Sequence, residues 1–286
     1  MKRTTGGSPK ARIVGAELRK AREAYGIGVR ELARRLGMDH SKLSRCESGR
    51  TVATPEFAAS VLAAVGVPEA ERERVIELAR GAERANWMSP GVPGVHHELT
   101  TLIEFEKTAK QITEVSPFVI SGLLQTADYA RALMSAGVGA PPSDLETRVT
   151  LRVGRRDVLT RKKGPRFTFL ALETALRTAI GGPEVMADQL RQILSMSEWP
   201  SVTVQVIPAD LDVWHPALLG SYILFEFPKA DPIVHLEQYA SAVFLYEQEQ
   251  TDAYRSATDT LRELAMSPAE SGELIAKVAE EMESRT

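Results

Sequence analysis

The chain has 286 residues, of which 43% are hydrophobic, and its formal net charge is −3. This length predicts about two domains, and the hydrophobic content excludes a globally disordered protein. The apolar runs are too short to span a membrane, and the first residues lack the apolar core of a secretory signal. The single cysteine excludes an intrachain disulfide. We therefore expect a cytoplasmic protein without a membrane partner.

Charge is unevenly distributed along the chain. Residues 1–52 contain 13 lysines and arginines against five acidic residues, a net charge of +8, which leaves −11 for the remainder. A basic segment joined to an acidic body favours a polyanionic partner on one side of the protein. The alternative is ordinary variation of surface charge. The basic excess coincides with a pair of short predicted helices, which argues against this alternative.

Residues 1–12 are polar and basic and contain glycine, serine and proline, which predicts a flexible arm. Lys10 and Arg12 in this arm could follow DNA phosphates or enter a minor groove. A tail without a role is the alternative.

Apolar periodicity and helix boundary residues predict five helices in a first domain, residues 13–85. The first three helices are expected over 13–25, 29–36 and 40–48. Asp39 is a good N-cap for the third helix. In that helix Leu43 and Cys46 are three residues apart and face the core. Polar and basic side chains remain on its outer face.

The segment LRKAREAYGIGVRELARRLGMDHSKLSRCESGR resembles the Cro/lambda-repressor-type (Xre) helix-turn-helix, over residues 13–66. The resemblance implies a DNA-binding domain and an ion pair between Arg22 and Glu47 that ties the first helix to the third. This family usually has Ser, Thr or Asn and then Gln at the start of the second helix. Here Gly28 and Val29 stand there, so the cap is weaker and one polar contact to DNA is lost.

A helix in the major groove reads base edges with its outer side chains. We expect base contacts from His40, Ser41, Lys42 and Arg45. Arg45 could bind guanine bidentately, and Lys42 could instead hold a phosphate. The residues expected at the DNA backbone are Arg30, Ser44, Arg50, Arg12 and Lys10.

Residues 86–97, NWMSPGVPGVHH, contain two prolines and two glycines and predict a linker, with Trp87 anchored against one domain. A second domain then covers residues 98–286. Its first part is expected to be helical, over 98–115, about 126–137 and 144–162. Thr126 is a plausible N-cap of the middle helix.

The third of these helices carries four arginines at i, i+4 and i+3 steps, namely Arg148, Arg152, Arg155 and Arg156. A solvated helix face is one interpretation. The other is a surface for an anionic ligand, a nucleic acid or an acidic partner. Glu173 and Glu237, at the ends of predicted strands, could line a pocket.

Strands are predicted over 167–172, 202–208, 221–227 and 233–236, because these runs are rich in β-branched and aromatic residues and are bounded by turns. Between the first two strands lies a helical stretch that Gly181-Gly182-Pro183 divides. The C-terminal part predicts helices over 239–249, 252–265 and 268–284, the last with a capping box at Ser267. The fold class is therefore an all-α helix-turn-helix domain of five helices followed by an α+β domain with a small mixed or antiparallel sheet.

The runs LLQTADYARAL, ALETALRTAIGGPEVMADQLRQIL, SVTVQVIP, GSYILFEF and AMSPAES make this second part similar to a C-terminal domain of unknown function in WhiJ-like actinobacterial developmental regulators. The resemblance implies transcriptional control, often beside a gene for a small partner protein. It implies no particular ligand or reaction. Ser121-Gly122 stands where Pro-Gly is usual, which could loosen that turn.

Motifs for catalysis are missing from the sequence. The five histidines form no HExxH or zinc spacing, and neither GxxxxGK[ST] nor GxGxxG occurs. His96, His97 and Glu98 are adjacent, so their side chains point in different directions and chance placement is favoured over a site. We expect no metal, no cofactor and no enzymatic activity; an enzyme with a helix-turn-helix appendage is the least favoured hypothesis.

The favoured hypothesis is a sequence-specific DNA-binding transcriptional regulator. One short helix reads only a few base pairs, so we expect a homodimer on an inverted repeat of double-stranded DNA. The second domain would supply dimerisation and the sensing of a partner or ligand. The alternative is an antitoxin-like interaction protein that sequesters a small protein encoded nearby and autoregulates its operon.

Overall fold

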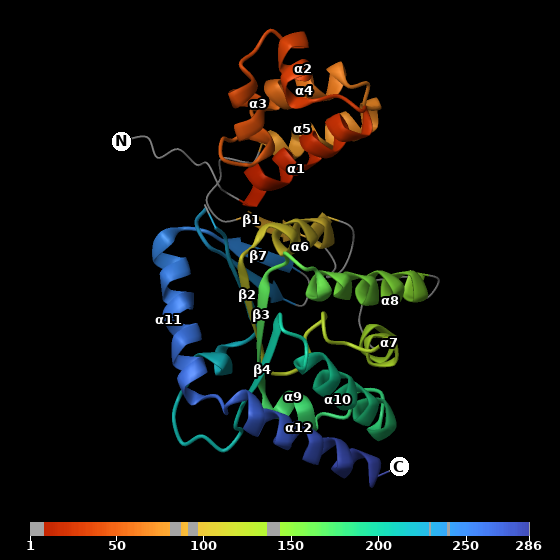
Figure 1. Ribbon diagram of the computed structural model, residues 1–286, viewed down its shortest axis with the longest axis vertical. Coiled ribbons are helices and arrows are strands. Elements are labelled where there is room, and N and C mark those ends of the chain that lie inside the picture. Colours follow the sequence, from red (N-terminus) through yellow and green to blue (C-terminus); the bar gives the residue numbers. More distant parts are fainter. Residues whose placement is uncertain are drawn as a thin grey trace. The chain divides into compact units, whose positions relative to one another are not determined.

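The structure is a computed structural model that describes residues 9–80, 87–90, 97–135, 144–228, 230–238 and 241–285. The chain divides into two compact units (Figure 1). The first unit is formed mainly by the N-terminal residues up to Trp87 and includes the short segments 229–231 and 244–247. The second unit contains the rest of the chain.

The first unit is a bundle of five helices, as predicted. Their bounds are α1 Pro9–Ala24, α2 Val29–Arg35, α3 His40–Glu47, α4 Pro55–Ala64 and α5 Glu69–Arg80. Helix α1 begins at Pro9, so the prediction of a flexible arm is wrong for residues 9–12. The predicted end of the fifth helix near residue 85 lies outside the described residues.

The core of the first unit follows the apolar periodicity of its helices. Leu18, Leu32, Leu43 and Leu62, from four different helices, are fully or almost fully buried. Helices α1 and α3 cross closely at Gly15, where a Cβ atom would lie 2.3 Å from the carbonyl oxygen of Cys46. Only glycine permits that approach, because 2.3 Å is well inside van der Waals contact.

The ends of these helices show which boundary residues carry hydrogen bonds. The Asp39 carboxylate accepts from the Ser41 N–H at 2.7 Å, and the Thr54 hydroxyl accepts from the Phe57 N–H at 3.2 Å. Both residues therefore cap their helices, and for Asp39 this confirms the prediction. At Gly28, the N-cap of α2, no side-chain capping bond exists. This agrees with the weaker cap that the sequence indicates there.

The second unit is built on a mixed sheet. The sheet has seven strands within the described residues, in the order β1-β7-β6-β5-β2-β3-β4. Strands β2, β3 and β4 run parallel, whereas β5 is antiparallel to both β2 and β6. The bounds are β1 Trp87–Pro90, β2 Gln111–Ser116, β3 Arg166–Leu172, β4 Val202–Ile207, β5 Tyr222–Glu226, β6 Ile233–Gln238 and β7 Ser241–Leu245. The mixed sheet is confirmed, and it is larger than expected.

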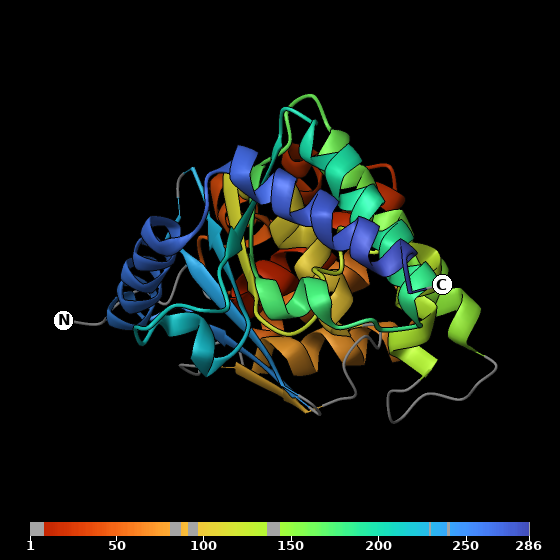
Figure 2. The same ribbon diagram turned by 90° about the horizontal axis from the view of Figure 1, so that it is seen from below.

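Helices cover both faces of this sheet. Figures 1 and 2 show α11 on one face and α7, α8 and α10 on the other. Helix α12 packs on α10 and β4. The bounds are α6 His97–Thr108, α7 Ala127–Ser135, α8 Leu145–Gly154, α9 Glu173–Arg177, α10 Pro183–Ser197, α11 Gln248–Leu264 and α12 Pro268–Glu283, with 3-10 turns at Arg155–Thr160 (η2) and Pro216–Leu219 (η3). The predicted capping box at Ser267 is present.

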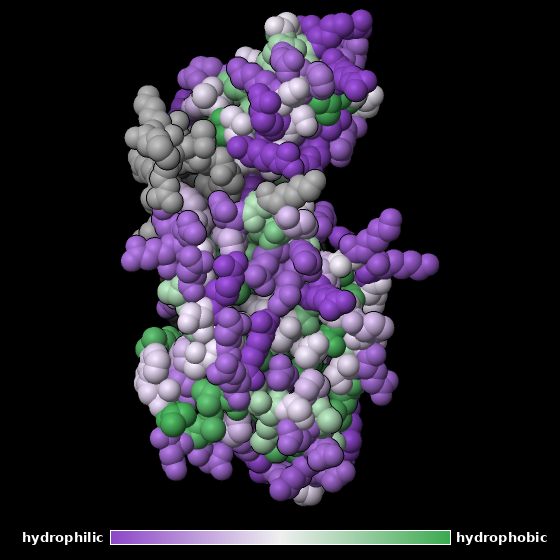
Figure 3. Space-filling model, turned by 60° about the vertical axis from the view of Figure 1, so that its left-hand side comes forward, coloured by the Kyte–Doolittle hydropathy of each residue, from purple (hydrophilic) through white to green (hydrophobic). Residues whose placement is uncertain are grey.

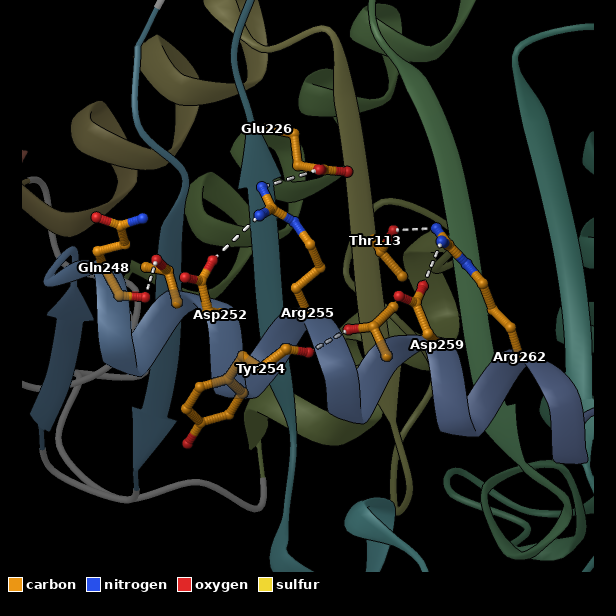
Figure 4. Close-up of polar contacts among 10 residues, drawn as sticks. Thr113, Glu226, Gln248, Asp252, Tyr254, Arg255, Asp259 and Arg262 are labelled. Atoms are coloured by element: carbon orange, nitrogen blue, oxygen red, sulfur yellow. Dashed lines mark hydrogen bonds and ion pairs between the residues drawn. The ribbon is translucent and has the colours of Figure 1, made fainter.

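Helix α11 is joined to the sheet by polar contacts as well as by packing (Figure 4). The Arg262 guanidinium donates to the hydroxyl of Thr113 on β2 at 2.9 Å. Arg255 lies 3.4 Å from the carboxylate of Glu226 on β5. Thr113 is fully buried, so its hydroxyl needs this partner.

Two predicted helices are partly strands in the structure. The helix expected over 98–115 ends at Thr108, and Gln111–Ser116 forms the interior strand β2. The helix expected over 239–249 is replaced in its first half by β7. Both strands are short runs with β-branched or aromatic residues, and pairing with distant segments decides their conformation.

Two further boundaries differ from the prediction. Strand β1 lies inside the segment predicted as a linker, and α6 begins at its last residue, His97. The side chain of Trp87 is outside the described part of the structure. The helix expected over 144–162 ends at Gly154 and continues as the 3-10 turn η2. Glycine in a helix interior is unfavourable, which explains the change at that position.

Candidate nucleic-acid interface

The outer face of α3 presents polar and basic side chains to solvent. His40, Lys42, Ser44 and Arg45 are exposed, and Ser41 is half-buried. The opposite face packs into the core through Leu43 and Cys46, which are 0% and 2% exposed. Helix α3 is thus fixed on one side and open on the other, which is the arrangement of a recognition helix.

The position of α3 is held by the ion pair that the family resemblance implies. Arg22 Nε lies 2.7 Å from Glu47 Oε1, and Arg22 Nη2 donates to Glu47 Oε2 at 3.0 Å. Arg22 Nη1 also donates to the backbone oxygen of Ile27 at 2.9 Å. The hydrogen bond to Glu47 raises the pKa of the Arg22 guanidinium, and both side chains are buried. Arg19 adds a bond of 2.6 Å to the Glu47 carbonyl oxygen at the end of α3.

The basic residues around α3 differ in whether their side chains already have a partner within the protein. Arg34 and Arg35 form exposed ion pairs with Glu31 on their own helix. The ammonium of Lys42 lies 5.4 Å from the centre of the Phe57 ring, a cation–π contact. In the described parts of the chain, no hydrogen bond or ion pair engages the side chains of three exposed residues, Arg30, Arg45 and Arg50. Their guanidinium groups are free to bind an anionic partner.

Arg12 does not belong to this surface. It lies in α1, is 9% exposed, and its guanidinium donates to the backbone oxygen of Asp231 at 3.3 Å. Burial lowers the pKa of Arg12 to about 10, and the charge of Asp231 partly offsets that effect. The prediction that Arg12 reaches DNA from a flexible arm is therefore wrong. Lys10 is in the same helix, and its side chain is outside the described part of the structure.

The four arginines of the second unit do not form a solvated face. All four are half-buried, and three of them contact neighbouring elements. Arg155 forms an ion pair with Glu106 of α6, and Arg156 donates to the backbone oxygen of Gln125. Arg152 lies 3.5 Å from the Gln125 side-chain oxygen. The solvated alternative is wrong because the loop around Gln125 and helix α6 cover this side of α8.

Three of these arginines line a pocket between α8 and the sheet, with a cavity volume of about 70 Å³. Glu114, Ile223 and His235 form its floor, in one row across β2, β5 and β6. Glu237 extends the floor, as the sequence suggested for this residue. The other lining residues come from α6, α7, α8, η2 and the turn before α7, namely Leu102, Met134, Arg148, Leu151, Arg152, Arg155, Gly122 and Leu123.

Glu114 was missed by sequence reasoning and is the most unusual group in this pocket. Burial raises the pKa of its carboxyl, although hydrogen bonding to Ser121 and the charge of Arg155 act in the opposite direction. Ser121 Oγ donates to Glu114 Oε2 at 2.7 Å, so this serine stabilises the turn that it was expected to loosen. At Gly122 a Cβ atom would lie 2.8 Å from Arg152 Nη1. The β-branched residues of QITEVS, Ile112, Thr113 and Val115, were the available signal for this strand.

Glu173 is separate from the pocket. It begins α9, pairs with Arg177 at 2.7 Å and accepts from the Ala209 N–H at 3.2 Å. Burial opposes ionisation of its carboxyl, but the hydrogen bonds from Arg177 and Ala209 outweigh it and lower the pKa. Glu173 therefore has a structural partner, and the expectation that it shares a surface with the arginines is wrong.

The fold and the exposed third helix define a helix-turn-helix protein with an additional α+β unit, and the helix-turn-helix supports DNA binding. Residues 13–75 match a family model described as a helix-turn-helix domain. Residues 99–277 match the family described as a domain of unknown function (DUF5753), and the chain belongs to that family. No helix within the described ranges is long and apolar enough to cross a membrane.

Comparison with individual proteins adds little. None of the curated proteins compared matches the chain. Among solved structures, the chain is similar to TrmBL2, described as an archaeal chromatin protein whose structure shows a novel mode of DNA binding, at 13% identity and a TM-score of 0.30. The match covers 70% of this chain and spans 61% of the length of that one. A likeness at this level carries no argument about function.

Proposed function

We propose that the protein is a sequence-specific DNA-binding transcriptional regulator of the Xre type, with α3 in the major groove. The observation that carries this proposal is the outer face of α3, which is exposed and polar while the helix is fixed from behind by Leu43, Cys46 and the Arg22–Glu47 pair. Rigid support of this kind keeps the reading side chains in one geometry.

The positions and contacts of the exposed side chains suggest which of them contact bases and which contact phosphates. Arg45 is exposed in the last turn of α3, and a guanidinium there can bind guanine O6 and N7 together. His40 and Ser41 are at the N-terminal end of α3, where recognition helices contact base edges. Arg30, Ser44 and Arg50 are exposed around this helix and would contact phosphates. The contact of Lys42 with Phe57 favours a positioning contact to phosphate over base reading.

We further propose that the protein acts as a homodimer on an inverted repeat. Helix α3 has only eight residues and can reach few base pairs, so two copies are needed for a specific site. The second unit offers an apolar surface for the second copy, formed by Val213, Trp214, Leu218 and Leu219, of which Leu219 is 80% exposed. Figure 3 shows hydrophobic side chains gathered on one face of the second unit. Sedimentation of the unaltered chain and of Leu219→Ser would test this; a monomer in both would refute it.

Genome-wide mapping of binding sites tests the regulatory proposal. We expect the wild type to occupy a set of sites that share an inverted repeat, and Arg45→Ala to lose occupancy or tolerate substitution at one position of each half-site. Arg80→Ala, which removes an exposed arginine of α5, is the matched control and should leave the sites unchanged. Equal site sets and occupancies for wild type and Arg45→Ala would refute the assignment of α3. The proposal gives the protein no enzymatic activity.

A further inference from the structure

The pocket between α8 and the sheet contains donors that the described residues leave without acceptors. The Nε atoms of Arg148 and Arg155 are buried and have no hydrogen-bond partner among those residues. The guanidinium of Arg148 also makes no ion pair there, whereas Arg155 is paired with Glu106. A buried donor without an acceptor destabilises a protein, so such donors beside a cavity indicate an acceptor-bearing ligand.

The pocket is lined by three arginines and two glutamates, Glu114 and Glu237, which favours an anionic ligand of low charge. Three arginines face Glu106, Glu114 and Glu237, so the ionised groups balance. Burial raises the pKa of Glu114, so this carboxyl opposes an anionic ligand less than an ordinary carboxylate would. A neutral carboxyl can also donate a hydrogen bond to an anion. A dianion would be repelled more strongly by Glu237 than a monoanion would.

Several other lining residues are apolar and suit a hydrocarbon chain. Leu102 and Leu123 are 8% and 4% exposed, and Met134 and Ile223 are half-buried at the same cavity. The cavity is small, about 70 Å³, and it is open to solvent on one side. A short aliphatic chain can pack there while its charged end meets the arginines.

We propose that this pocket binds a small aliphatic monocarboxylate, whose carboxylate is held by Arg148 and Arg152 and whose chain packs on Leu102, Leu123 and Met134. Guanidinium groups bind carboxylates bidentately, which suits two arginines one helical turn apart on α8. This inference does not depend on the proposed function, because the pocket lies wholly within the second unit.

Isothermal titration calorimetry on the full chain tests the proposal with hexanoate, its neutral analogue hexanamide, acetate and inorganic phosphate at one ionic strength near neutral pH. Hexanoate should bind, and hexanamide should bind at least tenfold more weakly. Each chain methylene that is buried should tighten binding by about fourfold, so acetate should be much weaker than hexanoate. Equal affinities for hexanoate and hexanamide, or phosphate binding as tightly as hexanoate, would overturn the proposal, as would the absence of any hexanoate binding.

Variants locate the site. Arg148→Gln should weaken hexanoate binding at least tenfold, whereas Arg161→Gln, an exposed arginine just after η2, should bind like the wild type. Unchanged binding in Arg148→Gln with a native circular dichroism spectrum would overturn the assignment. If Arg148→Gln does not fold, the four-ligand comparison on the unaltered chain still decides the question. DNA binding is measured separately, so a failure here leaves the regulatory proposal to its own test.

Discussion

Two nitrogen atoms of Arg22 meet both carboxylate oxygens of Glu47, at 2.7 Å for Nε–Oε1 and 3.0 Å for Nη2–Oε2, so helices α1 and α3 are joined by a bidentate ion pair. The carboxylate is almost inaccessible, because Glu47 is 4% exposed. The pair therefore matters less for the attraction that it adds than for the isolated charge that its loss would leave.

Arg22→Ala should lower the stability of the first unit by roughly 3–5 kcal/mol, because it leaves the buried Glu47 carboxylate without its partner. Arg34→Ala removes an exposed pair with Glu31 and should cost at most about 1 kcal/mol. Urea denaturation followed by circular dichroism would measure both. Equal losses would contradict the structural role of the pair.

Gly15→Ala should destabilise the first unit by about 1–3 kcal/mol, because the new methyl group would force α1 away from the backbone of α3. Gly28→Ala is the matched control, since a Cβ atom there meets nothing within 4 Å. Its cost should stay below about 1 kcal/mol, the difference between glycine and alanine at an N-cap. A thermal melt of each variant distinguishes the two sites, and similar Tm values would show that the helix crossing is looser than described.

Arg30→Ala should weaken binding to all duplexes by a similar factor and reduce the slope of log K against log salt by about 1, because it removes one phosphate contact. Titration of a labelled duplex at several salt concentrations measures the slope. Arg80→Ala, with an equal change of net charge on α5, should leave the slope unchanged. If the slope of log K against log salt in Arg30→Ala equals that of the wild type, this arginine does not belong to the interface.

Glu114→Gln should stabilise the second unit at neutral pH. Burial raises the pKa of Glu114 above its ordinary value of 4.5, so the folded protein retains this proton to a higher pH than the unfolded chain does. In the wild type, the contribution of the Glu114 carboxyl to stability is fully present below the ordinary pKa of 4.5 and is lost as the pH rises through the pKa of the folded protein. The excess Tm of Glu114→Gln should therefore shrink as the solution is acidified toward about pH 4.5.

Glu173→Gln provides a control of opposite sign for this pH dependence. Hydrogen bonds from Arg177 and Ala209 lower the pKa of Glu173 despite its burial, so its stabilising effect is present at neutral pH and lost on acidification. This variant should be less stable than the wild type at neutral pH, by an amount that falls as the pH decreases. Parallel pH profiles for the two variants would refute the different environments assigned to these carboxyls.

The first unit could be predicted closely from the sequence because its signals are local. Asp39 and Thr54 cap their helices with bonds to residues two or three positions ahead, and apolar side chains three or four apart mark the buried faces. The Arg22–Glu47 pair came from family resemblance, since nothing local joins residues 25 positions apart. The start of α1 was misplaced because its first turn is polar, although Arg12 is buried there.

In the second unit the prediction failed where distant segments decide the conformation. Strand β2 follows a helix after two residues, and its apolar residues continue the helical spacing of α6. Its pairing with β3 and β5, more than 50 residues away, makes it a strand. The spacing of Arg148 and Arg152 was visible in the sequence, but the elements that bury them were not. Glu114 could not be selected while its strand was read as a helix.

Strand β2 carries two consecutive polar residues that serve opposite faces of the sheet. Thr113 bonds to Arg262 of α11 on one side, and Glu114 bonds to Ser121 beside the pocket on the other. Both faces are covered, so hydrophobicity alone would allow the strand to slip by one position. Such a slip would turn the Glu114 carboxyl toward α11 and the Thr113 hydroxyl toward the pocket, so each side chain would lose the partner that it has now. These two polar side chains therefore fix the alignment of β2 between β3 and β5.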